Sequence, residues 1–205
     1  MYSSTWQEII TTSLAPGSGY STTTTIDGYS QLDTMPNIFS AGQQQDVPFM
    51  MGMAEGDGAS FFNQTVELVP QIRQNTSKVY AYMLGFVPTG WKMDGGLAFH
   101  SEDREYIFGA PQVFAGTDFE AYAMPSGAKF PDPGFDARSD WFIEFMVHTW
   151  IQFAATGDPN LAPGTLEGPP LATWPPYEFR SDQYFRLDDP PSVNSGFSKL
   201  VLSIP

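Results

Sequence analysis

The sequence predicts an α/β fold, and three segments carry that prediction. Residues 48–53 (PFMMGM) form a short apolar run between turn residues, which is typical of a buried strand. Residues 79–87 (VYAYMLGFV) are rich in β-branched and aromatic side chains and are followed by Pro88, which closes a second strand. Between residues 138 and 156, large apolar side chains recur at helical spacing. Strands that alternate with helices indicate a sheet with helices packed against it.

The helix over 138–156 has recognisable ends. Ser139 or Asp140 can cap its first turn, and Gly157 with the Asp158-Pro159 that follows it can end it. Its large apolar residues are so numerous that we expect burial on more than one side.

A second helix is expected from about Ser60, directly after the glycine-containing turn that follows the first strand. Its predicted buried residues are Phe61, Phe62 and Val66. A shorter helical pattern covers residues 35–43.

The C-terminal part of the chain adds a Pro-rich loop over 160–177 and two short strands, at 184–187 and 200–204. Two strongly apolar strands are too few for an independent sheet, which usually has about five or six strands. We therefore expect residues 1–205 to form a single domain that is the last portion of a larger α/β fold, with its sheet incomplete.

Charge excludes one broad class of function. Asp and Glu number 23 against 9 Lys and Arg, and the formal net charge is −14. A nucleic-acid-binding protein needs clustered Lys and Arg for phosphate contacts, so we expect no nucleic acid as a partner. The acidic excess either steers cationic ligands or simply keeps the surface solvated.

The sequence lacks the residue patterns that several other chemistries require. The chain has no Cys, no spaced His/Cys set for zinc, no phosphate-binding Gly-x-x-x-x-Gly-Lys and no dinucleotide fingerprint, so we expect no zinc, phosphate-loop or dinucleotide site. No apolar stretch reaches the roughly 18 residues of a membrane span, and residues 1–19 lack the features of an export signal. The compartment remains open.

Of the two histidines, His100 has the more suggestive surroundings. It follows a strand and a Gly-rich turn, and it precedes an acidic run of Glu102, Asp103 and Glu105. A loop histidine beside carboxylates is well placed for general base catalysis, although a solvated loop histidine would have the same context. His148 lies within the aromatic helix, where packing is the simpler role.

A carboxylate can orient such an imidazole, and two are available after the first strand. Asp57 stands in a Gly-Asp-Gly turn, and Glu55 competes with it for the role. An acid that precedes the histidine matches the Ser, acid, His order of α/β hydrolases. The serine element is absent, because no Gly-x-Ser-x-Gly and no His-Gly-Gly loop occur in the sequence.

Five segments, in order along the chain, match motifs of one known family. They are IDGYSQLD at 26–33, VPFMMGMAEGDGASFF at 47–62, AFHSEDREYIFG at 98–109, MVHTWIQFAATGDPN at 146–160 and WPPY at 174–177. The second is similar to a strand that ends in Gly-x-x-x-Asp-Glu-Gly-Ser, and the third to His-Gly-x-Glu-x-x-x-x-Phe-Gly. Together they resemble the type-B carboxylesterases, which include the cholinesterases.

The resemblance implies the C-terminal portion of an α/β hydrolase without metal or cofactor, acting on a small-molecule carboxylic ester. It makes His100 the catalytic histidine and Asp57 the catalytic acid. Asp103 and Glu105 fall on acidic motif positions and are expected to support the pair by hydrogen bonds. The aromatic residues Trp91, Phe99 and Phe114 are candidates for the substrate pocket, with packing in the core as the simpler alternative for each.

The departures from the family pattern are also informative. Asp57 replaces the usual Glu, Ser101 the usual Gly, and Arg104 an apolar residue. The interval between the acid and the histidine is shorter than is common in the family, which predicts a more open active site.

Three functional hypotheses follow. In the first, the chain is an ester hydrolase that is inactive alone and needs an N-terminal half, or a complementing chain, to supply the serine and the oxyanion donors. In the second, it is a non-catalytic, cholinesterase-like binding module. In the third, it is an autonomous hydrolase that uses Ser60 or Ser101, neither of which sits on a recognisable nucleophile elbow.

Overall fold

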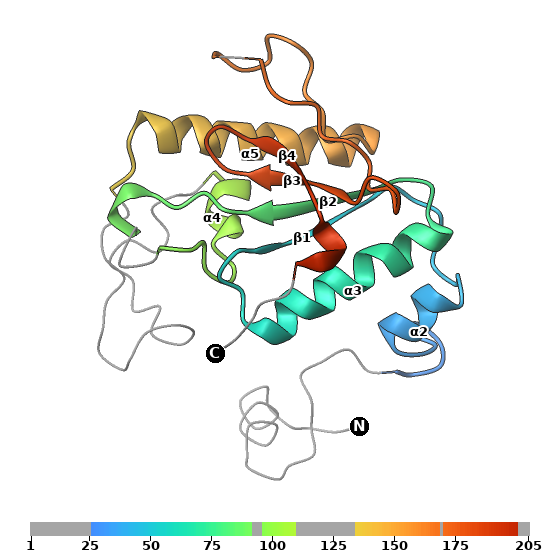
Figure 1. Ribbon diagram of the computed structural model, residues 1–205. Helices are drawn as coiled ribbons and strands as arrows, with labels where there is room; N and C mark the ends of the chain where they lie inside the picture. The colour runs from blue at the N-terminus through green and yellow to red at the C-terminus, as the bar shows by residue number, and fades with distance from the viewer. Residues whose placement is uncertain (1–25, 92–95, 110–133, 169, 201–205) are drawn as a thin grey trace, which may run out of the picture.

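A four-stranded mixed sheet forms the centre of the structure, with helices on both faces (Figure 1). The computed structural model describes residues 26–91, 96–109, 134–168 and 170–200. The sheet order is β1-β2-β3-β4; β1, β2 and β3 run parallel and β4 is antiparallel to β3. The strands are β1 Phe49–Ala54, β2 Val79–Leu84, β3 Gln183–Leu187 and β4 Ser192–Ser195. This incomplete sheet with its helices is part of an α/β-hydrolase fold, as the sequence predicts.

The helices cover the sheet as separate layers. Helix α5 lies along one face and α3 along the other, as Figure 1 shows. The α-helices are α2 Met35–Ser40, α3 Ala59–Asn75, α4 Asp103–Ile107 and α5 Ala137–Thr156, and the 3-10 helices are η1 Thr89–Trp91 and η2 Phe197–Lys199.

Strand β2 supplies side chains to both cores, because successive strand residues point to opposite faces. Tyr80 and Leu84 are buried in the cluster that includes α5, whereas Val79, Ala81 and Met83 are buried in the cluster that includes α3. A strand that is apolar on both faces is typical of a covered parallel sheet.

The main helices begin and end at identifiable residues. Asp136 caps α5, since its side chain accepts hydrogen bonds from the backbone N–H groups of Arg138 and Ser139. The prediction that Ser139 or Asp140 caps the helix is therefore wrong, because the helix starts at Ala137 and both residues already lie within its first turn. Gly157 ends it in the left-handed conformation, with φ of 73°, as predicted.

Helix α3 corrects the prediction about Phe61. The residues that it buries include Phe62, Val66, Val69 and Ile72, which recur at helical spacing. Phe61 lies outside this stripe and is 54% exposed, so its predicted burial is wrong.

Several short elements were not predicted, among them α4 and β4. Helix α4 occupies the acidic run after His100, and β4 pairs with β3 through a short connection. The strand expected at 200–204 lies outside the described residues except for Leu200, which follows η2 and is not in a strand.

The predicted loop over 160–177 has neither helix nor strand among its described residues, and it is pinned to the sheet. The Asn160 side chain exchanges two hydrogen bonds with the Trp174 backbone, at 2.7 and 3.0 Å, and the Trp174 indole donates to the Ala81 carbonyl. Two of the five motif-like segments, at 146–160 and 174–177, are therefore hydrogen-bonded to each other. In the part of the chain that is described, no helix is long and apolar enough to cross a membrane.

Candidate active site

The candidate site lies where β1 and β2 end. Because the two strands are parallel, the loops that follow them leave the same edge of the sheet. Gly56 and Phe99 form an isolated parallel bridge beyond the strands, and the Gly56 N–H donates to the Ala98 carbonyl at 2.7 Å. A Cβ on Gly56 would lie 2.8 Å from that carbonyl oxygen, so only glycine allows this approach. The bridge sets Asp57 and His100 beside each other.

Asp57 and His100 are in direct contact. The imidazole Nδ1 lies 2.7 Å from Asp57 Oδ1, and Asp57 Oδ2 accepts the Ala54 backbone N–H at 2.9 Å. Asp57 is 8% exposed, whereas 52% of the His100 side chain is accessible. An ionised carboxylate only accepts hydrogen bonds, so this contact assigns the proton to Nδ1 and leaves Nε2 as the basic nitrogen. Phe61 stacks on the ring, with centroids 4.8 Å apart.

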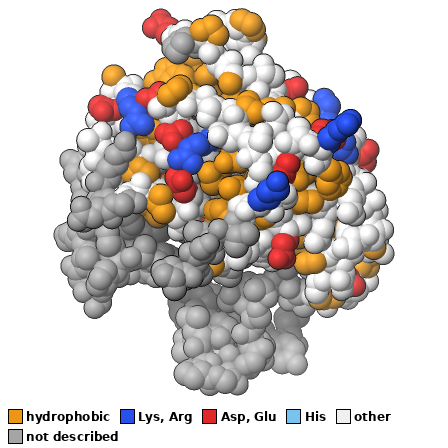
Figure 2. Space-filling model, viewed as in Figure 1, with side chains coloured by type: hydrophobic (Ala, Val, Ile, Leu, Met, Phe, Trp, Pro, Cys, Tyr) orange, Lys and Arg blue, Asp and Glu red, His pale blue; other side chains and the backbone are white. Residues whose placement is uncertain are grey.

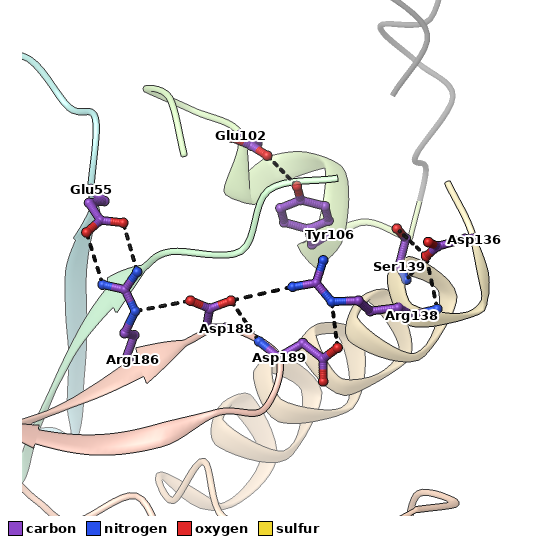
Figure 3. Close-up of polar contacts among 9 residues, drawn as sticks. All are labelled: Glu55, Glu102, Tyr106, Asp136, Arg138, Ser139, Arg186, Asp188 and Asp189. Atoms are coloured by element: carbon purple, nitrogen blue, oxygen red, sulfur yellow. Dashed lines mark hydrogen bonds and ion pairs between the residues drawn. The ribbon is translucent and has the colours of Figure 1, made fainter. Parts of the chain in front are cut away.

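Glu55 is engaged elsewhere. Its two carboxylate oxygens accept hydrogen bonds from the Arg186 guanidinium at 3.1 and 2.8 Å. Figure 3 shows that this pair is the first in a row of ion pairs, in which Asp188 links Arg186 to Arg138. Of the two carboxylates considered from the sequence, the one that touches His100 is therefore Asp57.

The acidic run beyond His100 lies in helix α4 and the turn before it, with Glu102 and Glu105 buried and Asp103 partly buried. The Tyr82 hydroxyl lies 3.5 Å from Asp103 Oδ2, and burial together with the nearby charge of Asp57 raises the pKa of Asp103. Burial raises the pKa of Glu105 to about 7. Its Oε2 has no hydrogen-bond partner among the described residues. Of the two predicted supporting residues, Asp103 thus lies near the pair, while Glu105 makes no hydrogen bond to it in the described part of the chain.

A third acidic residue of this run, Glu102, was not predicted as a supporting residue, yet its side chain accepts two hydrogen bonds. Its carboxylate accepts the Phe99 backbone N–H at 2.9 Å and the Tyr106 hydroxyl (Figure 3). Burial raises its pKa to about 7, against the opposing effect of these two hydrogen bonds. A signal was available in the sequence, because Glu102 and Tyr106 are spaced i, i+4 and can share a helix face.

Comparison with known proteins decides the family. A profile described as the carboxylesterase family matches residues 58–203, most of the chain. The chain belongs to the carboxylesterase family. It is also 30% identical over 96 residues to a bile salt-activated lipase of Bos taurus; the match covers 47% of this chain and 13% of the bovine protein. In this carboxylesterase-family chain, His100 lies within the matched range and Asp57 lies one residue before it.

The three aromatic residues predicted for the substrate pocket differ in where they lie. Trp91 is buried in the core, and its ring is tilted against Phe99 at 5.3 Å between centroids. Phe99 is only partly buried and flanks His100 in the chain. Phe114 lies outside the described residues.

Three further candidates were considered from the sequence: His148, Ser60 and Ser101. His148 is half-exposed on α5, with Nε2 3.9 Å from Glu144 Oε1. Ser60 is in the first turn of α3, and Ser101 directly follows His100 with φ of 70°. No group of three or more His, Cys, Asp or Glu with metal-binding geometry was found in the described residues.

Figure 2 bears on the acidic surplus for one face of the molecule. Figure 2 shows acidic and basic side chains side by side on the face drawn there, without one continuous acidic area. On that face, the arrangement favours a solvated mixed surface over a site that attracts cations.

Proposed function

We propose that this chain supplies the histidine and the acid of a carboxylic ester hydrolase, and that a serine outside these 205 residues completes the catalytic set. The observation that carries the proposal is the 2.7 Å contact between a buried carboxylate, Asp57, and a half-exposed imidazole, His100. A buried acid that fixes one ring nitrogen while the ring stays accessible is what a general base requires.

The chemistry follows from the proton positions. With Nδ1–H donated to Asp57, His100 Nε2 takes the proton from the serine hydroxyl as the oxygen attacks the ester carbonyl. The imidazolium then returns this proton to the departing alcohol, which leaves an acyl-serine. Water deprotonated by the same nitrogen then attacks the acyl group, and the imidazolium returns the proton to the serine oxygen as the carboxylic acid is released. Asp57 orients the ring and stabilises its charged form throughout.

The serine must come from another segment because the sequence contains no Gly-x-Ser-x-Gly. An N-terminal half of the hydrolase, or a complementing chain, is the proposed partner. Without it His100 has no hydroxyl to activate, and each missing oxyanion donor costs about 2.7 to 4 kcal/mol of transition-state stabilisation. We therefore expect the chain to be inactive alone, with a small-molecule carboxylic ester as the substrate of the completed enzyme.

The test is an assay on 4-nitrophenyl butyrate, with the chain alone and mixed with an N-terminal half that carries Gly-x-Ser-x-Gly. Hydrolysis that appears only on mixing supports the proposal. In the mixture, His100→Ala should lower kcat roughly 10⁶-fold, as loss of a triad histidine does elsewhere. His148→Ala is the matched control and should leave the rate unchanged, since this histidine lies on α5 beside Glu144.

Two outcomes contradict the proposal. One is hydrolysis in the mixture that survives His100→Ala. The other is a mixture without hydrolysis in which the ester still binds equally well to a variant carrying both His100→Ala and Asp57→Ala. The second outcome would favour the non-catalytic binding module.

A further inference from the structure

We propose that Glu102 is a positioning residue that holds His100 against Asp57. The inference rests on the proposed function and deepens it, because it names a further residue on which the same site depends. The evidence is a chain of contacts that runs from the core, through the Glu102 carboxylate, to the turn that carries the imidazole.

The turn over residues 99–102 is closed twice. The Glu102 backbone N–H donates to the Phe99 carbonyl at 3.1 Å, as in an ordinary β-turn. In the opposite direction, the Phe99 backbone N–H donates to Glu102 Oε2 at 2.9 Å. His100 and Ser101 are the two central residues, so the imidazole projects from a turn whose first and last residues are tied together by both bonds.

This turn needs reinforcement because of Ser101. Its φ of 70° lies in the left-handed region, which is unfavourable for a residue with a Cβ and is usually occupied by glycine. Here a serine occupies it, so the backbone alone favours another conformation. The side-chain bond from Glu102 across the turn opposes that tendency.

The Glu102 carboxylate is itself fixed. Glu102 is fully buried, and its second oxygen accepts the hydroxyl of Tyr106, which is also fully buried (Figure 3). The Tyr106 ring packs edge-on against Phe86 and Phe142 in the core between the sheet and α5. The position of the turn is thereby coupled to the core of the protein.

The neighbouring acids do not provide the same link. Asp103 lies near the Tyr82 hydroxyl, and Glu105 Oε2 has no hydrogen-bond partner in the described residues. Glu105 is buried, is the same residue type and is three positions away. It therefore serves as a matched control.

The experiment uses the 205-residue chain labelled with ¹⁵N-histidine, observed by NMR at about pH 9, well above the ordinary pKa of an imidazole in a model peptide. Only two histidines are present, so His148 is an internal reference. In the wild-type chain we expect His100 to hold its proton on Nδ1, as the contact with Asp57 requires. Glu102→Leu should lose this tautomer, Glu102→Gln should largely keep it because the amide oxygen still accepts the Phe99 N–H, and Glu105→Leu should not change it.

A rescue separates positioning from general damage. Glycine adopts a positive φ without the penalty that a Cβ imposes. Adding Ser101→Gly to Glu102→Leu should therefore make the native turn favourable again and restore most of the tautomer signal. In the enzyme completed by an N-terminal half, Glu102→Leu should lower kcat about 10- to 100-fold with little change in KM, as a displaced catalytic group does. Circular dichroism checks that each variant is folded. If Glu102→Leu does not fold, Tyr106→Phe takes its place, since it removes the anchor of the carboxylate, and it should lower the tautomer fraction.

The possible failures are distinguishable. A wild-type chain in which His100 lacks the Nδ1–H tautomer contradicts the contact with Asp57, and with it the proposed function. A wild-type chain that has the tautomer, together with a folded Glu102→Leu or Tyr106→Phe variant that retains it in full, overturns the role of Glu102 alone.

Discussion

Replacing Glu102 with glutamine should make stability less dependent on pH between about 4.5 and 7. Burial raises the pKa of the Glu102 carboxyl from its ordinary value of 4.5 to about 7. The hydrogen bonds from Tyr106 and Phe99 oppose the increase, and the charges of Asp103 and Glu105 add to it. Glutamine has nearly the same shape but does not titrate.

The sign follows from proton binding. In the unfolded chain Glu102 loses its proton near pH 4.5, whereas in the folded chain it keeps the proton until about pH 7. The free energy of unfolding therefore falls as pH rises through this window and is constant above it. The difference between the two pKa values corresponds to about 3 kcal/mol, at about 1.4 kcal/mol for each pH unit.

Urea unfolding at pH 5, 6, 7 and 8, followed by tryptophan fluorescence, measures this contribution. The difference in unfolding free energy between the wild-type chain and Glu102→Gln should change by about 2 to 3 kcal/mol between pH 5 and pH 8, with the wild-type chain losing more as pH rises. Glu144→Gln, at an exposed position on α5, is the control and should follow the wild-type chain. Parallel curves for the wild-type chain and Glu102→Gln would refute the reasoning that burial, rather than hydrogen bonding, dominates this carboxyl.

Three further changes test the site and its surroundings. Asp57→Asn should lower kcat of the completed enzyme roughly 10⁴-fold in an ester hydrolysis assay, because the amide no longer fixes the Nδ1–H tautomer; a loss below tenfold would contradict its role as the acid. Gly56→Ala should push the chain away from the Ala98 carbonyl and lower both the melting temperature and kcat. An unchanged rate would show that the close approach of Gly56 to Ala98 is not needed to bring Asp57 and His100 together. Arg186→Gln should destabilise the fold by about 1 to 2 kcal/mol, because Glu55 loses a bidentate partner at a partly exposed site, and the effect should shrink in high salt; a salt-independent loss would contradict an electrostatic origin.

Periodicity was sufficient to predict the main elements. Strands β1 and β2 and helix α5 have apolar patterns long enough to identify their type, and the structure confirms each with boundaries that differ by a few residues. The α5 cap was mispredicted because Asp136, Ser139 and Asp140 are all good capping residues, and the sequence does not show which one precedes the first helical turn. Strand β4 was missed because its residues, Ser192–Ser195, are mostly polar and lie at the edge of the sheet.

The sequence was sufficient to predict which strand ends meet at the site. Parallel strands leave their carboxyl ends at one edge, so an acid after β1 and a histidine after β2 were expected near each other. The sequence could not separate Asp57 from Glu55, because the residue that engages Glu55 is Arg186, 131 positions away. Likewise, the support given by Glu102 depends on a turn at Ser101 whose left-handed backbone is not evident from a serine.

The most direct test of the proposed division of labour is labelling with a fluorophosphonate probe, which forms a covalent bond with an activated serine. With this chain and an N-terminal half together, we expect the label on the serine of that half alone, and we expect it to vanish when His100→Ala replaces the wild-type chain. Label on a serine of this chain in the absence of any partner, such as Ser60 or Ser101, would contradict the account.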